Sequence, residues 1–183
     1  MLYLSYMNIR ELIQEQLAEY YDPSFPRAEY LKWKRNNVSY RGMRDVSNST
    51  ENGGMARFGS GLYTAALSNK TMAKGYGDVY FVVNGVPKHP KVIKDANQAE
   101  IWIQQNLYMP FSKKAGLNYP DSRVFNEHTT IAKEMMKLGY DGLIISGREM
   151  VNYNPPPNVE YFRDESQVQN YFMLNVFGKG TVS

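Results

Sequence analysis

The amino-acid sequence predicts an α+β fold with a mostly antiparallel sheet. Segments with helical periodicity lie early and in the middle of the chain, whereas short runs typical of strands gather toward its end. Helices and strands do not alternate as they do in parallel β-α-β folds. With 183 residues, 43% of them hydrophobic, the chain is long enough for one core and short for two. We therefore expect a single domain.

Composition excludes several kinds of site. The chain has no cysteine, which rules out disulfides, thiolate metal sites and a cysteine nucleophile, and which fits a reducing cytosol. No apolar run approaches about 18 residues, so we expect no membrane span. The start, residues 1–7, lacks the basic end of a signal peptide, and Met7 is an alternative first residue. These features predict a cytoplasmic protein. The net charge of +3 permits an acidic partner or a nucleotide without requiring one.

The first 37 residues are predicted to form a helical segment that packs on a core of residues 38–183. Apolar side chains at helical spacing indicate a helix over residues 8–20. Residues 27–37 mix aromatic and basic side chains, a pattern that also occurs in nucleic-acid-binding surfaces. A helix whose cations reach solvent is the interpretation we favour for them.

The stretch from Arg57 to Gly77 is the feature around which the other segments are interpreted. It reads as a glycine turn, a short strand that ends at Tyr63, and a short helix that Ser68 can cap. A strand is expected on either side, over residues 38–42 and 78–84. The polar residues 45–54 are expected to form a loop.

The second half is predicted to contain two more helices among short strands. Asp95 and Gln98 can cap the first of these helices. The second is expected over residues 126–138, with Met135 and Met136 facing inward and Gly139 as its stop. Strands are expected over residues 91–94, 140–146, 159–162 and 167–177, and loops over residues 108–125 and 151–158.

Several standard sites fail on inspection. Gly59-Ser-Gly61 lacks the third glycine and the preceding strand of a dinucleotide-binding fingerprint. His89 and His128 are the only histidines, and neither has a partner spaced as a metal ligand or a catalytic base would be. We expect no metal.

Three separated motifs remain. The first is Tyr40-Arg-Gly42 at the end of a strand, and the second is Phe58-Gly-Ser-Gly-Leu-Tyr63 with its trailing helix to Tyr76. The third is Asn158-Val-Glu-Tyr-Phe162, which Gln167-Val168 follows. Together they resemble the ADP-ribosyltransferase superfamily, in its poly-ADP-ribose-polymerase-like and phage-type branches. The segment from Leu138 to Ile145, Leu-Gly-Tyr-Asp-Gly-Leu-Ile-Ile, is also similar to a strand of bacterial and phage members.

The resemblance implies a fold, a substrate and a set of roles. The fold would be a split core of two sheets with flanking helices, and the substrate NAD. Glu160 would stabilise positive charge on the ribose, and Tyr63 would stack on the nicotinamide ring. The Gly42 backbone would hold the carboxamide, and Arg41 would bind the adenosine-side ribose or the pyrophosphate. The remaining NAD-binding residues would be Gly61, Ser68 and Tyr76.

Simpler interpretations stand beside these roles. Tyr63 can be a half-buried strand residue, Arg41 a charge at a strand end and Glu160 an exposed edge residue. Glu165 competes with Glu160 for the catalytic role, and Glu149 ranks third. Asn158 stands where arginine-modifying members carry a second glutamate, which counts against arginine as the acceptor.

The expected function is mono-ADP-ribosyl transfer from NAD to a protein or a nucleic acid inside a cell, which would be the host cell if the chain is phage-encoded. One alternative is an NAD glycohydrolase with the same site. Another is a catalytically silent module that binds NAD or ADP-ribose. A fourth, weaker hypothesis is nucleic-acid binding through residues 30–35.

Overall fold

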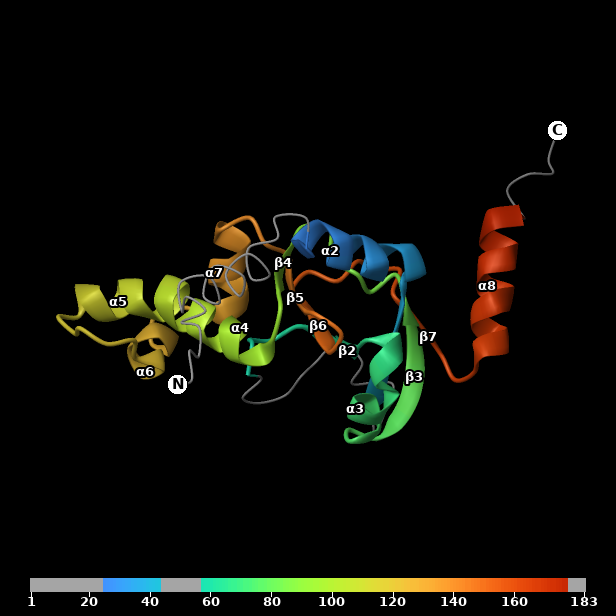
Figure 1. Cartoon of the computed structure of the whole chain (residues 1–183), viewed down its shortest axis with the longest axis horizontal. Helices are drawn as coiled ribbons and strands as arrows, with labels where there is room; N and C mark the ends of the chain where they lie inside the picture. Colours follow the sequence, from blue (N-terminus) through green and yellow to red (C-terminus); the bar gives the residue numbers. More distant parts are fainter. Residues whose placement is uncertain (1–24, 44–56, 178–183) are drawn as a thin grey trace, which may run out of the picture.

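The computed structural model describes residues 25–43 and 57–177. The predicted helix over residues 8–20, the loop over 45–54 and the alternative start at Met7 lie outside these residues. Within them the fold is α+β, as the sequence predicts, with one seven-stranded sheet in the order β4-β5-β6-β2-β1-β3-β7 (Figure 1). Every strand pair is antiparallel except β4–β5. The strands are β1 (Val38–Met43), β2 (Leu62–Ala65), β3 (Asp78–Val83), β4 (Pro90–Ile93), β5 (Gly142–Ile145), β6 (Glu149–Asn152) and β7 (Glu160–Phe162).

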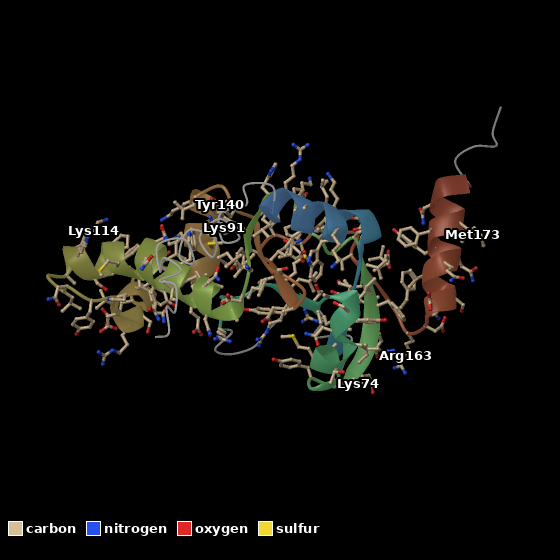
Figure 2. All side chains as sticks on the ribbon, in the orientation of Figure 1. Lys74, Lys91, Lys114, Tyr140, Arg163 and Met173 are labelled. Carbon is tan, nitrogen blue, oxygen red and sulfur yellow. The ribbon has the colours of Figure 1, made fainter. Side chains whose placement is uncertain are left out.

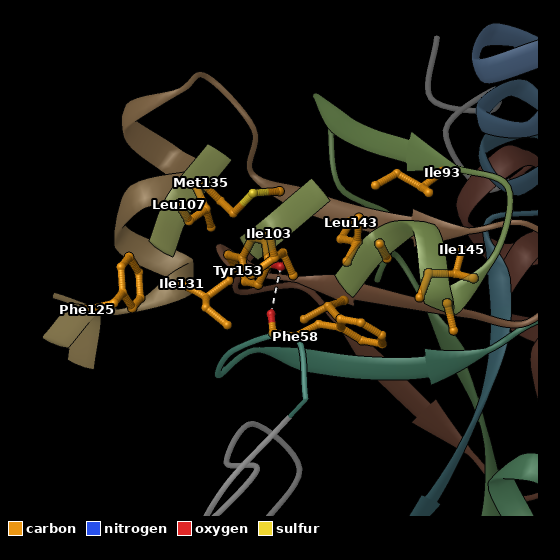
Figure 3. Packing of buried hydrophobic residues seen from close by; sticks show 13 residues of the cluster. Phe58, Ile93, Ile103, Leu107, Phe125, Ile131, Met135, Leu143, Ile145 and Tyr153 are labelled. Carbon is orange, nitrogen blue, oxygen red and sulfur yellow. Dashed lines mark hydrogen bonds between the residues drawn. The ribbon is translucent and has the colours of Figure 1, made fainter. Parts of the chain in front are cut away.

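Helices flank the sheet. They are α2 (Phe25–Asn36), the short turn η2 (Leu67–Asn69), α3 (Lys70–Lys74), α4 (Ala96–Ile103), η3 (Gln104–Tyr108), α5 (Met109–Lys114), α6 (Ser122–Asn126), α7 (Ile131–Lys137) and α8 (Glu165–Phe177). Helix α2, the described part of the predicted N-terminal segment, packs on the sheet through Trp33, which lies against Ile144 and Met150. The larger cluster lies on the other face, because Leu143 and Ile145 alternate with Ile144 along β5 (Figure 3).

The sheet has its fewest paired residues between β1 and β2. Strands β1 and β2 share a single registered pair, Tyr40 with Ala65, whereas β1 and β3 share six. The predicted division into two sheets is therefore not found as such, because one pair still joins the halves. What the structure has is one hydrogen-bonded sheet with a weak junction between β4-β5-β6-β2 and β1-β3-β7.

Several local signals predicted the elements correctly. The Asp95 carboxylate accepts a hydrogen bond from the Gln98 backbone N–H at 2.9 Å and caps α4. Gly139 has a φ of +86°, the left-handed conformation typical of a residue that ends a helix. The predicted strands in the regions of β1, β2, β3, β4, β5 and β7 are all present.

Other expectations were wrong. The predicted loop over residues 108–125 contains α5 and most of α6. The helix expected from Asn126 begins at Ile131, because Thr130 caps it there, and Met136 is exposed rather than inward. Strand β6 occupies residues expected in part to be a loop, since it pairs with both β2 and β5.

The last predicted strand is a helix, α8. The Asp164 carboxylate accepts from the Gln167 N–H at 3.0 Å, and Gln167 Oε1 accepts from the Asp164 N–H at 3.4 Å. This reciprocal pair is a capping box, a helix-start signal that the sequence contains. Figures 1 and 2 show α8 standing away from the helices that flank the sheet, with Met173 and Leu174 exposed along it.

Candidate functional site

A buried carboxylate, Glu149, stands at the start of β6. Its residue is only 7% exposed, although β6 begins directly after the turn over residues 146–148. Glu149 pairs with Ala65 of β2, and Val151 pairs with Tyr63. Because paired residues and alternate residues share a face, Glu149 and Tyr63 lie on the same side of the sheet.

Burial shifts the titration of Glu149, and its basic neighbours only partly offset the shift. Burial raises the pKa of its carboxyl, while Arg148, whose Nε donates to Oε1 at 3.0 Å, and Arg57 oppose the shift. The side chain of Arg148 is about half exposed. A desolvated carboxylate beside partly exposed cations is a candidate for a functional site.

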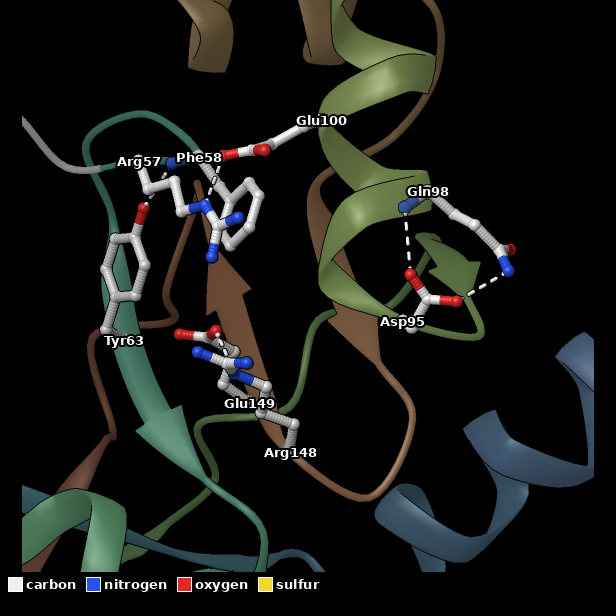
Figure 4. Close-up of polar contacts among 8 residues, drawn as sticks. All are labelled: Arg57, Phe58, Tyr63, Asp95, Gln98, Glu100, Arg148 and Glu149. Atoms are coloured by element: carbon white, nitrogen blue, oxygen red, sulfur yellow. Dashed lines mark hydrogen bonds and ion pairs between the residues drawn. The ribbon is translucent and has the colours of Figure 1, made fainter.

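Arg57 lies between two acids. Its Nε donates to the Glu100 carboxylate on α4, and its charge also acts on Glu149 (Figure 4). The Glu100 partner raises the pKa of Arg57, and Arg57 lowers the pKa of the Glu100 carboxyl. Both side chains are about 40% exposed, so this ion pair is open to solvent and contributes little to stability.

Tyr63 is fixed through its hydroxyl. The oxygen accepts from the Phe58 N–H at 3.0 Å, and the hydroxyl donates to the Gly59 carbonyl at 2.8 Å. Gly59 has a φ of +89°, a backbone conformation that favours glycine. The two hydrogen bonds to the Tyr63 hydroxyl hold this turn and the tyrosine side chain in place. Burial raises the pKa of the Tyr63 phenol, and the charges of Glu149 and Tyr76 act in the same direction. These effects place Tyr63, Tyr76 and Glu149 in one electrostatic environment.

Gly42 and Tyr76 meet where α3 packs on β1. A Cβ atom at Gly42 would lie 1.8 Å from the Ala73 carbonyl oxygen and 3.1 Å from the Tyr76 Cβ. Only glycine therefore lets α3 approach this closely. Tyr76 is 67% exposed at the end of the helix. The structure thus places Gly42 beside Tyr76, two of the residues expected to bind NAD, and Gly42 lies two residues beyond Tyr40, which pairs with Ala65 of the strand that carries Tyr63.

Gly61 lies where β2 approaches β6, and Ser68 lies on the η2 turn. A Cβ atom at Gly61 would lie 2.6 Å from the Asn152 carbonyl oxygen, so this glycine allows β2 and β6 to approach one another. Ser68 is exposed within η2 and does not cap α3, whose N-cap is Asn69 and has no side-chain hydrogen bond. The expected capping role of Ser68 was wrong, because η2 carries the chain past that position before α3 begins.

Arg41 spans the narrow junction of the sheet. The residue is 6% exposed, and its Nη1 donates to the Tyr63 carbonyl at 3.1 Å. Burial lowers the pKa of its guanidinium. Since Tyr40 is registered with Ala65 in the same row as Glu149, alternation puts Arg41 on the opposite side of β1 from Tyr40.

Glu160 lies far from this group. It is the exposed first residue of β7, the edge strand, and pairs with Val83 of β3. In the sheet order β7 is four strands from β6, which corresponds to roughly 19 Å at the usual strand spacing. Glu165, the other competitor, begins α8 beyond this edge. The carboxylate beside Tyr63 is therefore Glu149, which sequence reasoning ranked third.

The signal for Glu149 was present in the sequence. It lies four residues beyond the last residue of β5, across a turn of Ser146, Gly147 and Arg148, where an antiparallel partner strand is expected. Among the described residues, no group of three or more histidine, aspartate or glutamate side chains could hold a metal ion. No helix in the described ranges is long and apolar enough to cross a membrane.

No family model, curated protein or solved structure matches the chain. The functional interpretation therefore depends on the residues and geometry of the site itself.

Proposed function

We propose that the chain is an ADP-ribosyltransferase that moves ADP-ribose from NAD to a macromolecular acceptor, with Glu149 as its carboxylate. The observation that supports this is the placement of a buried acid on β6 beside Tyr63 of β2, with Tyr76 and Gly42 close to Tyr63. The sequence motif that suggested NAD supplies the tyrosines and the glycine. The structure adds a carboxylate in the same environment.

The chemistry needs one well-placed acid. When the bond between nicotinamide and ribose breaks, nicotinamide leaves as a neutral molecule with the bonding electron pair, and positive charge develops on the ribose. Glu149 would hydrogen-bond the ribose hydroxyl and stabilise that charge, and would take the proton as the acceptor bonds to the ribose carbon. Because nicotinamide is a good leaving group, no general acid is required.

The two tyrosines would hold the nicotinamide end. The Tyr63 ring is fixed by its hydroxyl bonds, whereas Tyr76 is exposed and free to close over a planar ring. The Gly42 backbone would bind the carboxamide. Ser68 is an exposed residue on the adjoining η2 turn.

For the pyrophosphate, the partly exposed Arg57 and Arg148 are better placed than Arg41. Both carry charge that acts on Glu149, and neither is buried. Arg41 was expected to bind the pyrophosphate or the adenosine-side ribose. Its guanidinium is buried and bonded to the Tyr63 carbonyl, so in this proposal it shapes the site by holding β1 to β2.

The test compares Glu149→Gln with Glu160→Gln in a lysate that contains labelled NAD. Released nicotinamide and label on protein and on nucleic acid are measured together. We expect Glu149→Gln to lower nicotinamide release at least about 100-fold, and Glu160→Gln to leave it close to wild type. The opposite pattern would return the catalytic role to Glu160, and no release by the wild-type chain would remove the transferase proposal.

The same experiment separates the alternatives. Release of free ADP-ribose without labelled polymer identifies an NAD glycohydrolase. NAD binding without release identifies a silent binding module. Salt-sensitive nucleic-acid binding that survives Glu149→Gln and Glu160→Gln identifies the surface of α2, where Lys32 and Lys34 are exposed.

A further inference from the structure

A second buried carboxylate, Glu29 of α2, lies on the other side of the turn that carries Glu149. The residue is 8% exposed. Its Oε1 accepts from the Trp33 Nε1 at 3.0 Å and from the Gly147 backbone N–H at 3.2 Å. The first bond is made within α2, but the second reaches a residue 118 positions away in the chain.

Gly147 is the middle residue of the turn between β5 and β6. It has a φ of +62°, and a Cβ atom placed there would meet nothing within 4 Å. The residues on either side are tied by backbone bonds: the Ser146 N–H donates to Ile93 and the Arg148 N–H to Ile145. For the Gly147 N–H, the partner is the Glu29 carboxylate.

From this geometry we infer that Glu29 is a positioning residue for Glu149. Glu149 follows Gly147 by two residues, and its neighbour Arg148 accepts at its carbonyl from the Ala66 N–H of the chain leaving β2 at 3.0 Å. The Glu29 bond fixes the outer end of the turn, and the Ala66 bond fixes its inner end against β2. Between them they set the direction from which the Glu149 side chain enters the space beside Tyr63.

A carboxylate is suited to this task. A carboxyl oxygen has two lone pairs, so Oε1 can accept from the Trp33 side chain and from the Gly147 backbone at the same time. Because Trp33 holds the same oxygen, the side chain of Glu29 has little rotational freedom to lose. A misplacement of about 1 Å at a reacting group is enough to slow a reaction about 100-fold, so a small movement of this turn has a measurable consequence.

The experiment compares Glu29→Ala with Glu29→Gln, and its catalytic arm rests on the proposed function. Gln retains an acceptor for the Gly147 N–H, whereas Ala does not. We expect Glu29→Ala to speed hydrogen exchange of the Gly147 amide about tenfold, the equivalent of one lost hydrogen bond. It should lower kcat for nicotinamide release about tenfold with KM little changed. Glu29→Gln should restore both toward wild type.

Trp33→Phe removes the other donor to Glu29 but leaves the Gly147 N–H its acceptor. Because Glu29 then loses the bond that limits its rotation, Gly147 exchange and kcat should change in the same direction as in Glu29→Ala, but less. Exchange of the Val82 amide, in the buried strand β3, reports whether each variant is folded. Unchanged Gly147 exchange in Glu29→Ala overturns the inference, as does an equal loss of kcat in the Ala, Gln and Trp33→Phe variants.

The inference and the proposed function can fail separately. If the wild-type chain releases no nicotinamide, the proposed function fails, and the exchange measurement still decides whether Glu29 holds the turn. The ¹³C shift of the Glu149 carboxyl then replaces kcat. We expect it to move in Glu29→Ala and to return in Glu29→Gln, and an unchanged shift in both would show that Glu149 is positioned without Glu29.

Discussion

At the scale of single residues, the buried Glu149 carboxylate opposes stability, and the proposed function gives it a chemical role. Its pKa is raised because burial disfavours the ionised form, and Arg148 and Arg57 only partly offset this. A carboxyl whose pKa is raised by folding makes its full contribution to stability when the pH lies below its ordinary pKa of 4.5. This contribution is lost as the pH rises through the pKa of the folded state. At neutral pH the ionised Glu149 carboxylate therefore lowers the free energy of unfolding.

Glu149→Gln should therefore melt at a higher temperature than wild type near pH 7, because Gln carries no charge to desolvate. The difference should shrink as pH falls below 4.5, where Glu149 becomes protonated in both the folded and the unfolded state. Thermal unfolding followed by circular dichroism across this pH range measures it. A variant less stable than wild type at every pH would show that the two arginines overcompensate the burial.

Substitution of Tyr63 can test the role of its hydroxyl separately from the role of its ring. Tyr63→Phe keeps the ring on β2 but removes the bonds to Phe58 and Gly59. We expect a loss of about 1 kcal/mol in the free energy of unfolding, measured by urea denaturation, with NAD binding retained. Tyr76→Phe is the control, because the Tyr76 side chain is largely exposed and the removal of its hydroxyl should leave stability unchanged. Loss of binding in Tyr63→Phe would mean that the hydroxyl itself contacts the ligand.

At the scale of elements, the approach of α3 to β1 depends on one glycine. A methyl group at Gly42 would overlap the Ala73 carbonyl. Gly42→Ala should displace α3, lower the unfolding free energy by about 2 kcal/mol and weaken NAD binding. Gly75→Ala is matched to it, since Gly75 lies at the end of the same helix with helical backbone angles, and a Cβ atom there would come no closer than 3.4 Å to its nearest neighbour, the Met72 carbonyl oxygen. Equal effects of the two changes would contradict this account.

The elements also show why some structure was predictable and some was not. Asp95 with Gln98, and Gly139, act within a few residues of themselves, so the sequence predicted the start of α4 and the end of α7. Strand β6 is different: its hairpin with β5 was signalled locally, but its place beside Tyr63 depends on pairing with β2, which lies far away in the chain. The candidate site shares that dependence: Tyr63 and Gly42 were found from local motifs, whereas the carboxylate that meets them was not.

Helix α8 was missed for another reason. Its aromatic and aliphatic side chains suggested a strand, although the capping box of Asp164 and Gln167 was visible in the sequence. In this case the local signal was available and the hydrophobic pattern outweighed it.

At the scale of the whole molecule, the narrow junction between β1 and β2 divides the sheet into unequal halves. Ladder bonds there are limited to the single pair of Tyr40 and Ala65, and the guanidinium of Arg41 adds a bond to the Tyr63 carbonyl. Tyr63 lies in one half and Gly42 with Tyr76 adjoins the other, so the proposed site is assembled across this junction. Its geometry depends on how firmly the halves are joined.

Arg41→Met keeps the length of the side chain and its apolar packing but removes the donor to Tyr63. Because this bond links the two halves, we expect amides of β1 and β3 to exchange about tenfold faster, while amides of β5 and β6 stay protected. Such uncoupling would show that the sheet opens in two cooperative units. Arg163→Met is the control: it removes a 2.9 Å bond to the Tyr80 hydroxyl within the β1-β3-β7 half and leaves the junction intact. Uniform acceleration over all seven strands in Arg41→Met would instead mean that the sheet unfolds as one unit, and that Tyr40 and Ala65 alone suffice to couple its halves.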